Sequence, residues 1–155
     1  MKTYLWIVTF LISIPLVTFA QEQEVAIERI VVTASRNKEE INSIPRTVRV
    51  ISATQIEASQ AQSIPELLTK EGSVRMRDFI GNGKTTNADI RGFGETGLSN
   101  VLVLVDGRRV NNIDLSGTDW TQIPVSMVQR IEILRGASSV LYGDNASGGV
   151  INIIT

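Results

Sequence analysis

The stretch that decides the fold is residues 123–155, IPVSMVQRIEILRGASSVLYGDNASGGVINIIT. Polar and apolar side chains alternate along residues 130–134, a period of two that predicts a strand with two different faces. Gly136 interrupts this strand. Residues 137–142 predict one or two helical turns that end at Gly143, because helices commonly stop at a glycine. The first half of the stretch is therefore predicted to be a strand followed by a short helix.

The second half of the stretch is predicted to be a loop and another strand. Residues 144–149, DNASGG, are rich in turn-forming residues. Residues 150–154 are apolar on both faces except at Asn152. Glu132 and Asp144 are the only acidic side chains in the whole stretch, and nothing in it could bind a metal well. We therefore expect it to be a scaffold.

This scaffold resembles the end of the plug domain of TonB-dependent outer-membrane receptors. In that family the plug ends with a strand, Arg-Gly, a short helix, Tyr-Gly and Gly-Gly-Val-Ile-Asn-Ile, and it then passes into a large barrel. The same order runs through residues 128–155, with Ala137 where the family often has proline. Residues 88–110 also resemble the family, whose plugs carry an Ile-Arg-Gly strand and a Val-Asp-Gly hairpin. The resemblance covers almost all of residues 28–155.

The composition permits a folded domain and excludes several kinds of chemistry. The chain has 155 residues, room for one domain, and 43% of them are hydrophobic. It has no cysteine and no histidine, which excludes thiol nucleophiles, disulfides, imidazole bases and the usual zinc, copper and haem ligands. The net charge of −1 gives no basic excess. We therefore expect no cofactor, no bound metal and no nucleic-acid partner.

The N-terminus has the features of a secretory signal peptide. Lys2 gives a positive start, residues 4–19 are uncharged and mostly apolar, and small residues stand three and one positions before Gln21. A membrane anchor is the alternative, but a spanning helix needs about 20 apolar residues, and this run is shorter and contains a serine and a proline. We predict that residues 1–20 are removed on export.

Residues 21–43 are predicted to be a flexible arm. Its start, QEQEVA, is acidic, and residues 27–35 are a β-prone run with polar neighbours. Such a run can add to the sheet edge of another chain, although the pattern alone favours an ordinary first strand of the domain. The resemblance favours strand addition, because the run resembles the TonB box that the protein TonB captures. The TonB-binding residues that it implies are Glu28, Arg29, Ile30, Val31, Val32, Thr33 and Ala34.

Residues 44–155 are predicted to form the plug, a small α+β domain on a mixed sheet. Capping patterns at Ser52 and Ser63 predict two helices, the second of which runs to about Lys70. Asp106-Gly107 is a strong hairpin signal. A short helix is expected after Pro124. Alternating or continuous apolar residues predict further strands at 47–51, 73–78, 88–91 and 101–105, the last of them, VLVLV, buried on both faces.

Two glycine-containing segments resemble nucleotide-binding motifs only superficially. Residues 92–97, GFGETG, have the dinucleotide-binding spacing, but the third glycine leads toward a strand and not into a helix. Gly83-Lys84-Thr85 resembles the end of a P-loop, but Asp78 stands where its first glycine is required. We predict loops at 79–87 and 92–100, the second of them flexible and without a useful helix.

The resemblance implies that outward loops of the plug contact a small-molecule ligand such as a metal chelate. We expect these loops at residues 79–87 and 113–120. Asp114 and Asp119 share the second loop, where a solvated loop is the default interpretation and a calcium site the alternative. Trp120 is expected to be exposed. The predicted ligand-facing residues are Phe79, Asn82, Lys84, Asn87, Asp114, Ser116, Asp119 and Trp120.

Several arginines are expected on strands beside apolar residues: Arg91, Arg108, Arg109, Arg130 and Arg135. Their pattern alone indicates solvated strand faces. The resemblance implies that plug arginines, and the glutamate at the position of Glu132, contact the polar inner wall of the barrel. The predicted plug–barrel contacts are Arg91, Arg130, Glu132 and Arg135.

The function that the resemblance implies is active uptake of a scarce ligand, of the ferric siderophore or vitamin B12 type, through the cell outer membrane. The expected partners are TonB and the receptor's own barrel of 22 strands, which needs roughly 220 residues and would follow residue 155. No bond of the ligand is broken, so we expect no enzyme activity. The alternatives are a free-standing periplasmic binding or signalling module and a secreted nucleotide-dependent enzyme built on the glycine loops.

Overall fold

The computed structural model describes residues 31–32, 39–40, 47–78, 81, 83–84, 86–112 and 117–155. The predicted signal peptide lies outside these residues, and so does the predicted arm apart from β1 (Val31–Val32) and β2 (Glu39–Glu40), which pair with each other. Other predicted site residues outside the described part are Glu28, Arg29, Ile30, Thr33, Ala34, Phe79, Asn82, Asp114 and Ser116.

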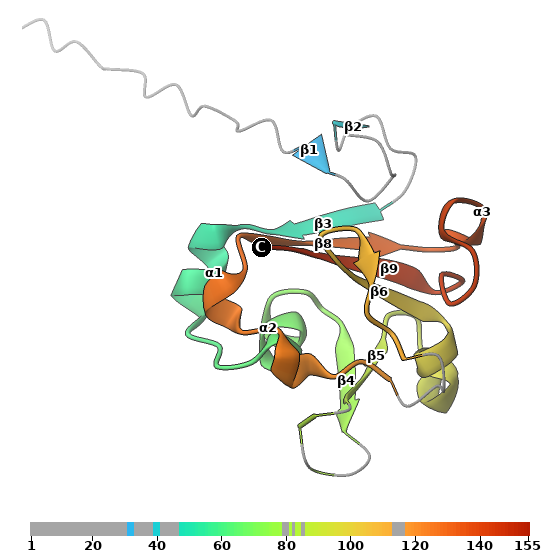
Figure 1. Cartoon of the computed structure of the whole chain (residues 1–155), viewed down its shortest axis with the longest axis horizontal. Helices are drawn as coiled ribbons and strands as arrows, with labels where there is room; N and C mark the ends of the chain where they lie inside the picture. The colour runs from blue at the N-terminus through green and yellow to red at the C-terminus, as the bar shows by residue number, and fades with distance from the viewer. Residues whose placement is uncertain are drawn as a thin grey trace, which may run out of the picture.

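A five-stranded mixed sheet is the centre of the fold (Figure 1). β6 and β9 are parallel, and the other neighbouring pairs are antiparallel. This confirms the predicted α+β fold and the strand–helix–strand unit at its C-terminal end. The strand order is β3 (Thr47–Ile51), β8 (Arg130–Arg135), β9 (Gly149–Ile154), β6 (Val101–Val105) and β7 (Arg108–Arg109).

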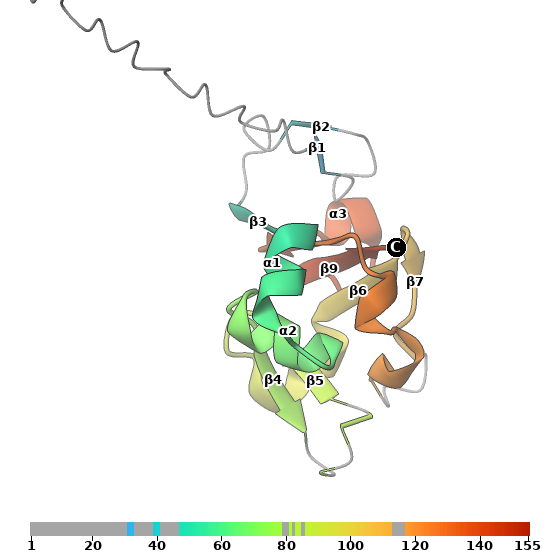
Figure 2. The ribbon, with the colours of Figure 1, turned by 90° about the vertical axis from the view of Figure 1, so that its left-hand side faces the viewer.

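Two helices and a second strand pair lie on one side of this sheet (Figures 1 and 2). They are α1 (Ala53–Ser59), α2 (Ile64–Lys70) and the antiparallel strands β4 (Arg75–Asp78) and β5 (Thr86–Asp89). In the part of the chain that the structure describes, every helix is too short to cross a membrane. The other helical turns are η2 (Gly94–Ser99), η3 (Trp120–Gln122), η4 (Val125–Met127) and α3 (Ser139–Tyr142).

Serine caps begin both long helices, as the sequence predicts. The Ser52 hydroxyl accepts a hydrogen bond from the Gln55 backbone N–H at 3.4 Å, and the Gln55 side chain accepts one from the Ser52 N–H at 3.0 Å, so the capping box is complete. Ser63 caps α2 through the backbone N–H of Glu66 at 3.4 Å. Hydrogen bonds between residues three positions apart therefore set where each helix begins, independently of its packing on the sheet.

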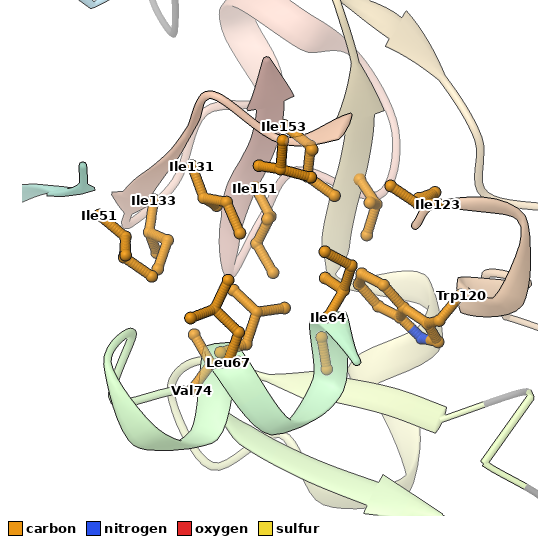
Figure 3. Packing of buried hydrophobic residues seen from close by; sticks show 14 of the residues in the cluster. Ile51, Ile64, Leu67, Val74, Trp120, Ile123, Ile131, Ile133, Ile151 and Ile153 are labelled. Carbon is orange, nitrogen blue, oxygen red and sulfur yellow. The ribbon is translucent and has the colours of Figure 1, made fainter. Parts of the chain in front are cut away.

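The main core fills the space between the sheet and α2 (Figure 3). Ile131 and Ile133 from β8, with Ile151 and Ile153 from β9, point toward Leu67 of α2, and all five side chains have 0% exposure. Successive residues of a strand point to opposite faces. The residues between these isoleucines therefore face the other side of the sheet.

The other side of the sheet carries a smaller apolar cluster. Leu102 and Leu104 of β6 belong to it, whereas Val101 and Val103 belong to the main core. The VLVLV strand is therefore buried on both faces, as predicted. The hairpin that follows it is also confirmed, because Asp106 and Gly107 have positive φ angles of 49° and 78°, as the tight turn of a two-residue hairpin requires.

The structure differs from the sequence-based prediction around β5. This strand begins at Thr86 and ends at Asp89, two residues earlier at each end than predicted. The predicted flexible loop at 92–100 contains η2. The Asp89 carboxylate explains this, since it accepts the backbone N–H groups of Gly92, Phe93 and Gly94 at 2.7, 2.9 and 3.1 Å. The short 3-10 helix η2 is thus held against the end of β5.

Candidate functional site

The two described strands of the predicted arm, β1 and β2, and the strands next to the first predicted ligand-facing loop, β4 and β5, lie on opposite sides of the five-stranded sheet (Figures 1 and 2). Both ribbon views place β1 and β2 on one side of the five-stranded sheet, and α2 with the β4–β5 pair on the other (Figures 1 and 2). β4 ends at Asp78, just before the predicted loop at 79–87, and β5 begins within that predicted loop at Thr86. The five-stranded sheet therefore lies between β1–β2 and the two strands next to this loop (Figures 1 and 2).

Trp120 is buried, and the prediction that it is exposed is wrong. Its side chain is 3% exposed, and its indole Nε1–H donates to the Thr86 carbonyl at 2.7 Å. Its backbone N–H donates to the Lys84 carbonyl at 3.1 Å. Trp120 is therefore a core residue that connects the end of the predicted loop at 113–120 to the end of the predicted loop at 79–87.

Replacing Trp120 with phenylalanine is expected to lower the free energy of unfolding by about 1–2 kcal/mol, because the buried Thr86 carbonyl loses a donor. Trp120→Ala, which also empties the space of the ring, should cost about 3–5 kcal/mol. Urea unfolding followed by circular dichroism measures both. A Trp120→Phe variant as stable as the parent would show that the indole hydrogen bond contributes nothing, and equal losses for both variants would show that the ring contributes nothing by packing.

Lys84 and Asp119, both predicted to face a ligand, lie side by side. Lys84 Nζ is 3.4 Å from Asp119 Oδ2. Asp119 also begins η3, since its carboxylate accepts the backbone N–H of Thr121 at 3.2 Å, the Thr121 hydroxyl at 2.6 Å and the Gln122 amide at 3.0 Å. These contacts, with the Thr121 hydroxyl first, lower the pKa of Asp119 to about 2.

The Asp119 carboxyl group is expected to titrate near pH 2. Because its folded pKa is below the ordinary 3.8, its contribution to stability is present above pH 3.8 and is lost as the pH falls through about 2. Carbon-13 NMR of the carboxyl group measures the midpoint. Thr121→Val should raise this pKa more than Lys84→Met, and the opposite order would contradict the ranking of the contacts.

Asn87 does not present its side chain at the surface. It lies within β5, is 1% exposed, and donates from Nδ2 to the Gly94 carbonyl at 3.1 Å. Its prediction as a loop residue that faces a ligand is therefore corrected. Among the described residues, no group of three or more His, Cys, Asp or Glu side chains could hold a metal ion, so the calcium alternative gains no support there.

The four predicted barrel-contacting residues have different environments. Arg91 is exposed and follows β5, so its placement on a strand is corrected. Arg135 Nη2 donates to the carbonyls of Gly72 and Ser73 at 2.8 and 3.0 Å and so holds the chain that follows α2. Arg135 thus has an internal structural role, and its predicted contact with a barrel stays a prediction.

Glu132 and Arg130 form an ion pair on the face of the sheet away from α2. Arg130 Nε is 2.9 Å from Glu132 Oε1, and Asn152 of β9 donates to Glu132 Oε2 at 3.5 Å. Glu132 has 0% exposure, whereas the Arg130 side chain is 31% exposed. In this conformation, only the Arg130 side chain of this pair is exposed enough to contact another molecule.

Sequence reasoning missed two carboxylates with defined roles. Asp89 is 2% exposed and organises η2; burial would raise its pKa, but the three N–H groups and Arg77 together lower it. Asp106 accepts the Thr155 backbone N–H at 3.1 Å and its hydroxyl at 2.7 Å. The glycines three and five residues after Asp89 were the available signal, since an Asp before such a turn commonly binds the backbone that follows.

A groove lies on the same face of the sheet as Arg130. It has a volume of about 730 Å³ and is lined by β6, β9, the β6–β7 turn and α3. Leu102, Leu104 and Ile154 form the apolar part of its lining. Arg109 and Arg130 contribute cationic groups, and Asp106 contributes a carboxylate. The size is within the usual range of ligand-binding pockets.

The family assignment is decided by residues 40–150, which match the model of the TonB-dependent Receptor Plug Domain. The chain belongs to this plug-domain family. The match spans most of the described fold and confirms the resemblance seen in the sequence. The plug domain is also 42% identical over 128 residues to the vitamin B12 transporter BtuB of Vibrio cholerae serotype O1, covering 83% of this chain and 20% of that protein.

Other relatives and solved structures agree with this assignment. The vitamin B12 transporter BtuB of Photobacterium profundum is 35% identical over 154 residues, which is 99% of this chain and 25% of that protein. The outer-membrane receptor FauA of Bordetella pertussis, named for alcaligin, superimposes with a TM-score of 0.61 at 19% identity, over 81% of this chain and 21% of that one. The plug domain spans about a fifth to a quarter of the curated relatives named here.

The ferric yersiniabactin uptake receptor FyuA of Yersinia pestis gives a TM-score of 0.56 at 26% identity, over 71% of this chain and 17% of that one. The named relatives are thus transporters and receptors. They share the plug fold across ligands of different chemistry, so the fold by itself does not select a ligand.

Proposed function

We propose that this plug domain closes the barrel of an outer-membrane receptor and couples uptake of a scarce ligand to TonB. Its family and its fold support the plug role. The observation that carries the proposal is the extended β1 segment, Val31–Val32, which lies in the predicted TonB box and already forms strand pairs with Glu39–Glu40. A segment that pairs in this way is suited to strand addition by a partner.

In the proposed mechanism, the ligand binds from outside on the loops beside Lys84 and Asp119 together with the barrel. Binding favours release of the arm, residues 21–43, on the other side of the sheet, which is an order-to-disorder switch. TonB then adds a strand to residues 28–34 and moves the plug. The ligand passes unchanged, so the proposed activity is transport and not catalysis.

Vitamin B12 is the ligand that we propose ahead of a ferric siderophore. The relatives with 42% and 35% identity are both named as vitamin B12 transporters. The ferric yersiniabactin uptake receptor FyuA is 26% identical over 71% of the chain, and the siderophore receptor PirA of Acinetobacter baumannii is 31% identical over 70%. The proposed location is the outer membrane, with the plug inside the barrel and the arm in the periplasm after removal of residues 1–20.

Replacing Val31 with proline is expected to weaken binding of the chain to the periplasmic domain of TonB by about tenfold, because proline removes a ladder donor worth about 1 kcal/mol and disturbs its neighbours. A calorimetric titration measures the affinity. Gln23→Pro, in the same arm but outside residues 28–34, is the matched control and should bind like the parent chain. Unchanged binding of the Val31→Pro variant would remove the TonB-box assignment.

A further inference from the structure

Both strands of the β4–β5 pair end in the same sequence motif. β4 ends at Asp78, which begins DFIGNG, residues 78–83, and β5 ends at Asp89, which begins DIRGFG, residues 89–94. Both segments have the form Asp-x-x-Gly-x-Gly. An aspartate therefore stands three and five residues before two glycines at the end of each strand.

In each motif the carboxylate accepts the backbone N–H groups of both glycines. Asp78 accepts those of Gly81 and Gly83, each at 2.7 Å. Asp89 accepts those of its two glycines at 2.7 and 3.1 Å. The first glycines of the motifs have φ angles of 74° and 80°, and the second glycines have φ angles of 65° and 63°. The two motifs therefore share their hydrogen bonds and the backbone angles of their glycines.

The surroundings of the two aspartates differ. Asp89 is 2% exposed, and its motif holds η2 inside the fold. Asp78 is exposed, and its motif opens the predicted ligand-facing loop at 79–87. Gly81 and Gly83 are also exposed, and a Cβ on either would have nothing within 4 Å. Packing does not hold these two glycines, so their positions depend on the Asp78 carboxylate.

We infer that Asp78 is a positioning residue, which fixes Gly83 and the adjoining Lys84 before a ligand binds; this inference rests on the proposed function. The Lys84 carbonyl accepts the Trp120 backbone N–H at 3.1 Å, and Lys84 Nζ lies 3.4 Å from Asp119 Oδ2. Contacts with β4 and with the second predicted loop therefore hold Gly83 and Lys84 from two directions. A surface that is ordered before binding loses less conformational freedom on binding, which strengthens affinity.

Amide hydrogen exchange in the full chain, followed by NMR, tests the effect of Asp78 on the backbone. Asp78→Ala is expected to speed exchange at Gly81 and Gly83 by about tenfold, because each amide loses a hydrogen bond to a charged acceptor. Gly92, which is bound by Asp89, is the internal control and should exchange at the parental rate. Parental exchange at both Gly81 and Gly83 in the Asp78→Ala chain would overturn the inference.

Ligand binding by the plug joined to its barrel tests the positioning role. Asp78→Ala is expected to weaken the binding of radiolabelled vitamin B12 by about tenfold. Asp78→Asn, which keeps one acceptor oxygen, should lie between this variant and the parent. The number of binding sites and the accumulation rate at saturating ligand should match the parent in both variants. A variant that loses binding sites but keeps the parental affinity would show a folding defect and overturn the inference.

Two glycine substitutions provide a matched pair that leaves the carboxylate intact. Gly83 and Gly107 have φ angles of 65° and 78°, and a Cβ on either would have nothing within 4 Å. Alanine therefore imposes a similar backbone strain at both positions. Only Gly83→Ala, which lies in the Asp78 motif, should weaken ligand binding, by about fivefold. Equal affinities of the Gly83→Ala and Gly107→Ala receptors would overturn the inference.

The ligand-binding measurement separates failure of this inference from failure of the proposed function. If the parent receptor binds vitamin B12 and the Asp78→Ala receptor binds it equally well, the inference fails and the proposed function stands. If the parent receptor does not bind vitamin B12, the proposed function fails and the inference fails with it. Weaker binding by Asp78→Ala, together with faster exchange at Gly81 and Gly83, is the result that the inference predicts.

Discussion

Replacing Arg130 with alanine is expected to lower the free energy of unfolding by about 3 kcal/mol, because the buried Glu132 carboxylate loses the guanidinium that compensates its charge. Arg130 Nε lies 2.9 Å from Glu132 Oε1, and Glu132 has 0% exposure. The Arg130 side chain is 31% exposed and therefore reaches water. We therefore expect the loss of unfolding free energy to be at the low end of the range for breaking a buried ion pair. Urea unfolding measures it.

A double variant separates the charge effect from a simple loss of packing. Glu132→Gln combined with Arg130→Ala removes the buried charge and keeps a similar shape, so it should recover at least half of the stability lost by Arg130→Ala. Arg108→Ala, an exposed arginine on the edge strand, should change stability by less than about 0.5 kcal/mol. The compensating role of Arg130 is contradicted if the single and double variants unfold at the same urea concentration.

Replacing Gly149 with alanine is expected to cost about 3 kcal/mol, the upper part of the range for overpacking. A Cβ at this position would lie 2.5 Å from the Leu134 carbonyl oxygen of the neighbouring strand and 2.8 Å from Ile90 Cδ1. The oxygen belongs to the backbone of β8, so the β8–β9 ladder itself must shift. Gly149 is the second glycine of the Gly148-Gly149 pair and the first residue of β9.

Gly107→Ala is the control for this substitution. Nothing lies within 4 Å of a Cβ there, but φ is +78°, so only the backbone preference is lost, worth about 1 kcal/mol. Thermal unfolding of both variants, monitored by circular dichroism, measures the difference. Losses of the same size would show that close approach of the strands at Gly149 is not what requires glycine.

The sequence was informative where a structure is set by neighbours along the chain. The alternation in residues 130–134 correctly predicted a strand with two different faces, and the serine caps located both helices. The Asp106-Gly107 turn was found for the same reason, since a two-residue hairpin depends on the φ angles of two adjacent residues.

The candidate site was harder to predict because its contacts join distant residues. The polar loop around Trp120 indicated exposure, but its indole binds the carbonyl of Thr86, 34 residues earlier. The Glu132–Asn152 contact depends on the register of β8 and β9, which local pattern does not give. The family resemblance supplied what the residue pattern could not, namely that this small domain is a plug.

The central claim is that this domain is moved by TonB through its arm, and uptake by the complete receptor tests it most directly. Cells that carry Val31→Pro in the plug joined to its barrel are expected to bind radiolabelled vitamin B12 at the surface like the parent but to lose energy-dependent accumulation by at least tenfold. Accumulation at the parental rate would contradict the claim.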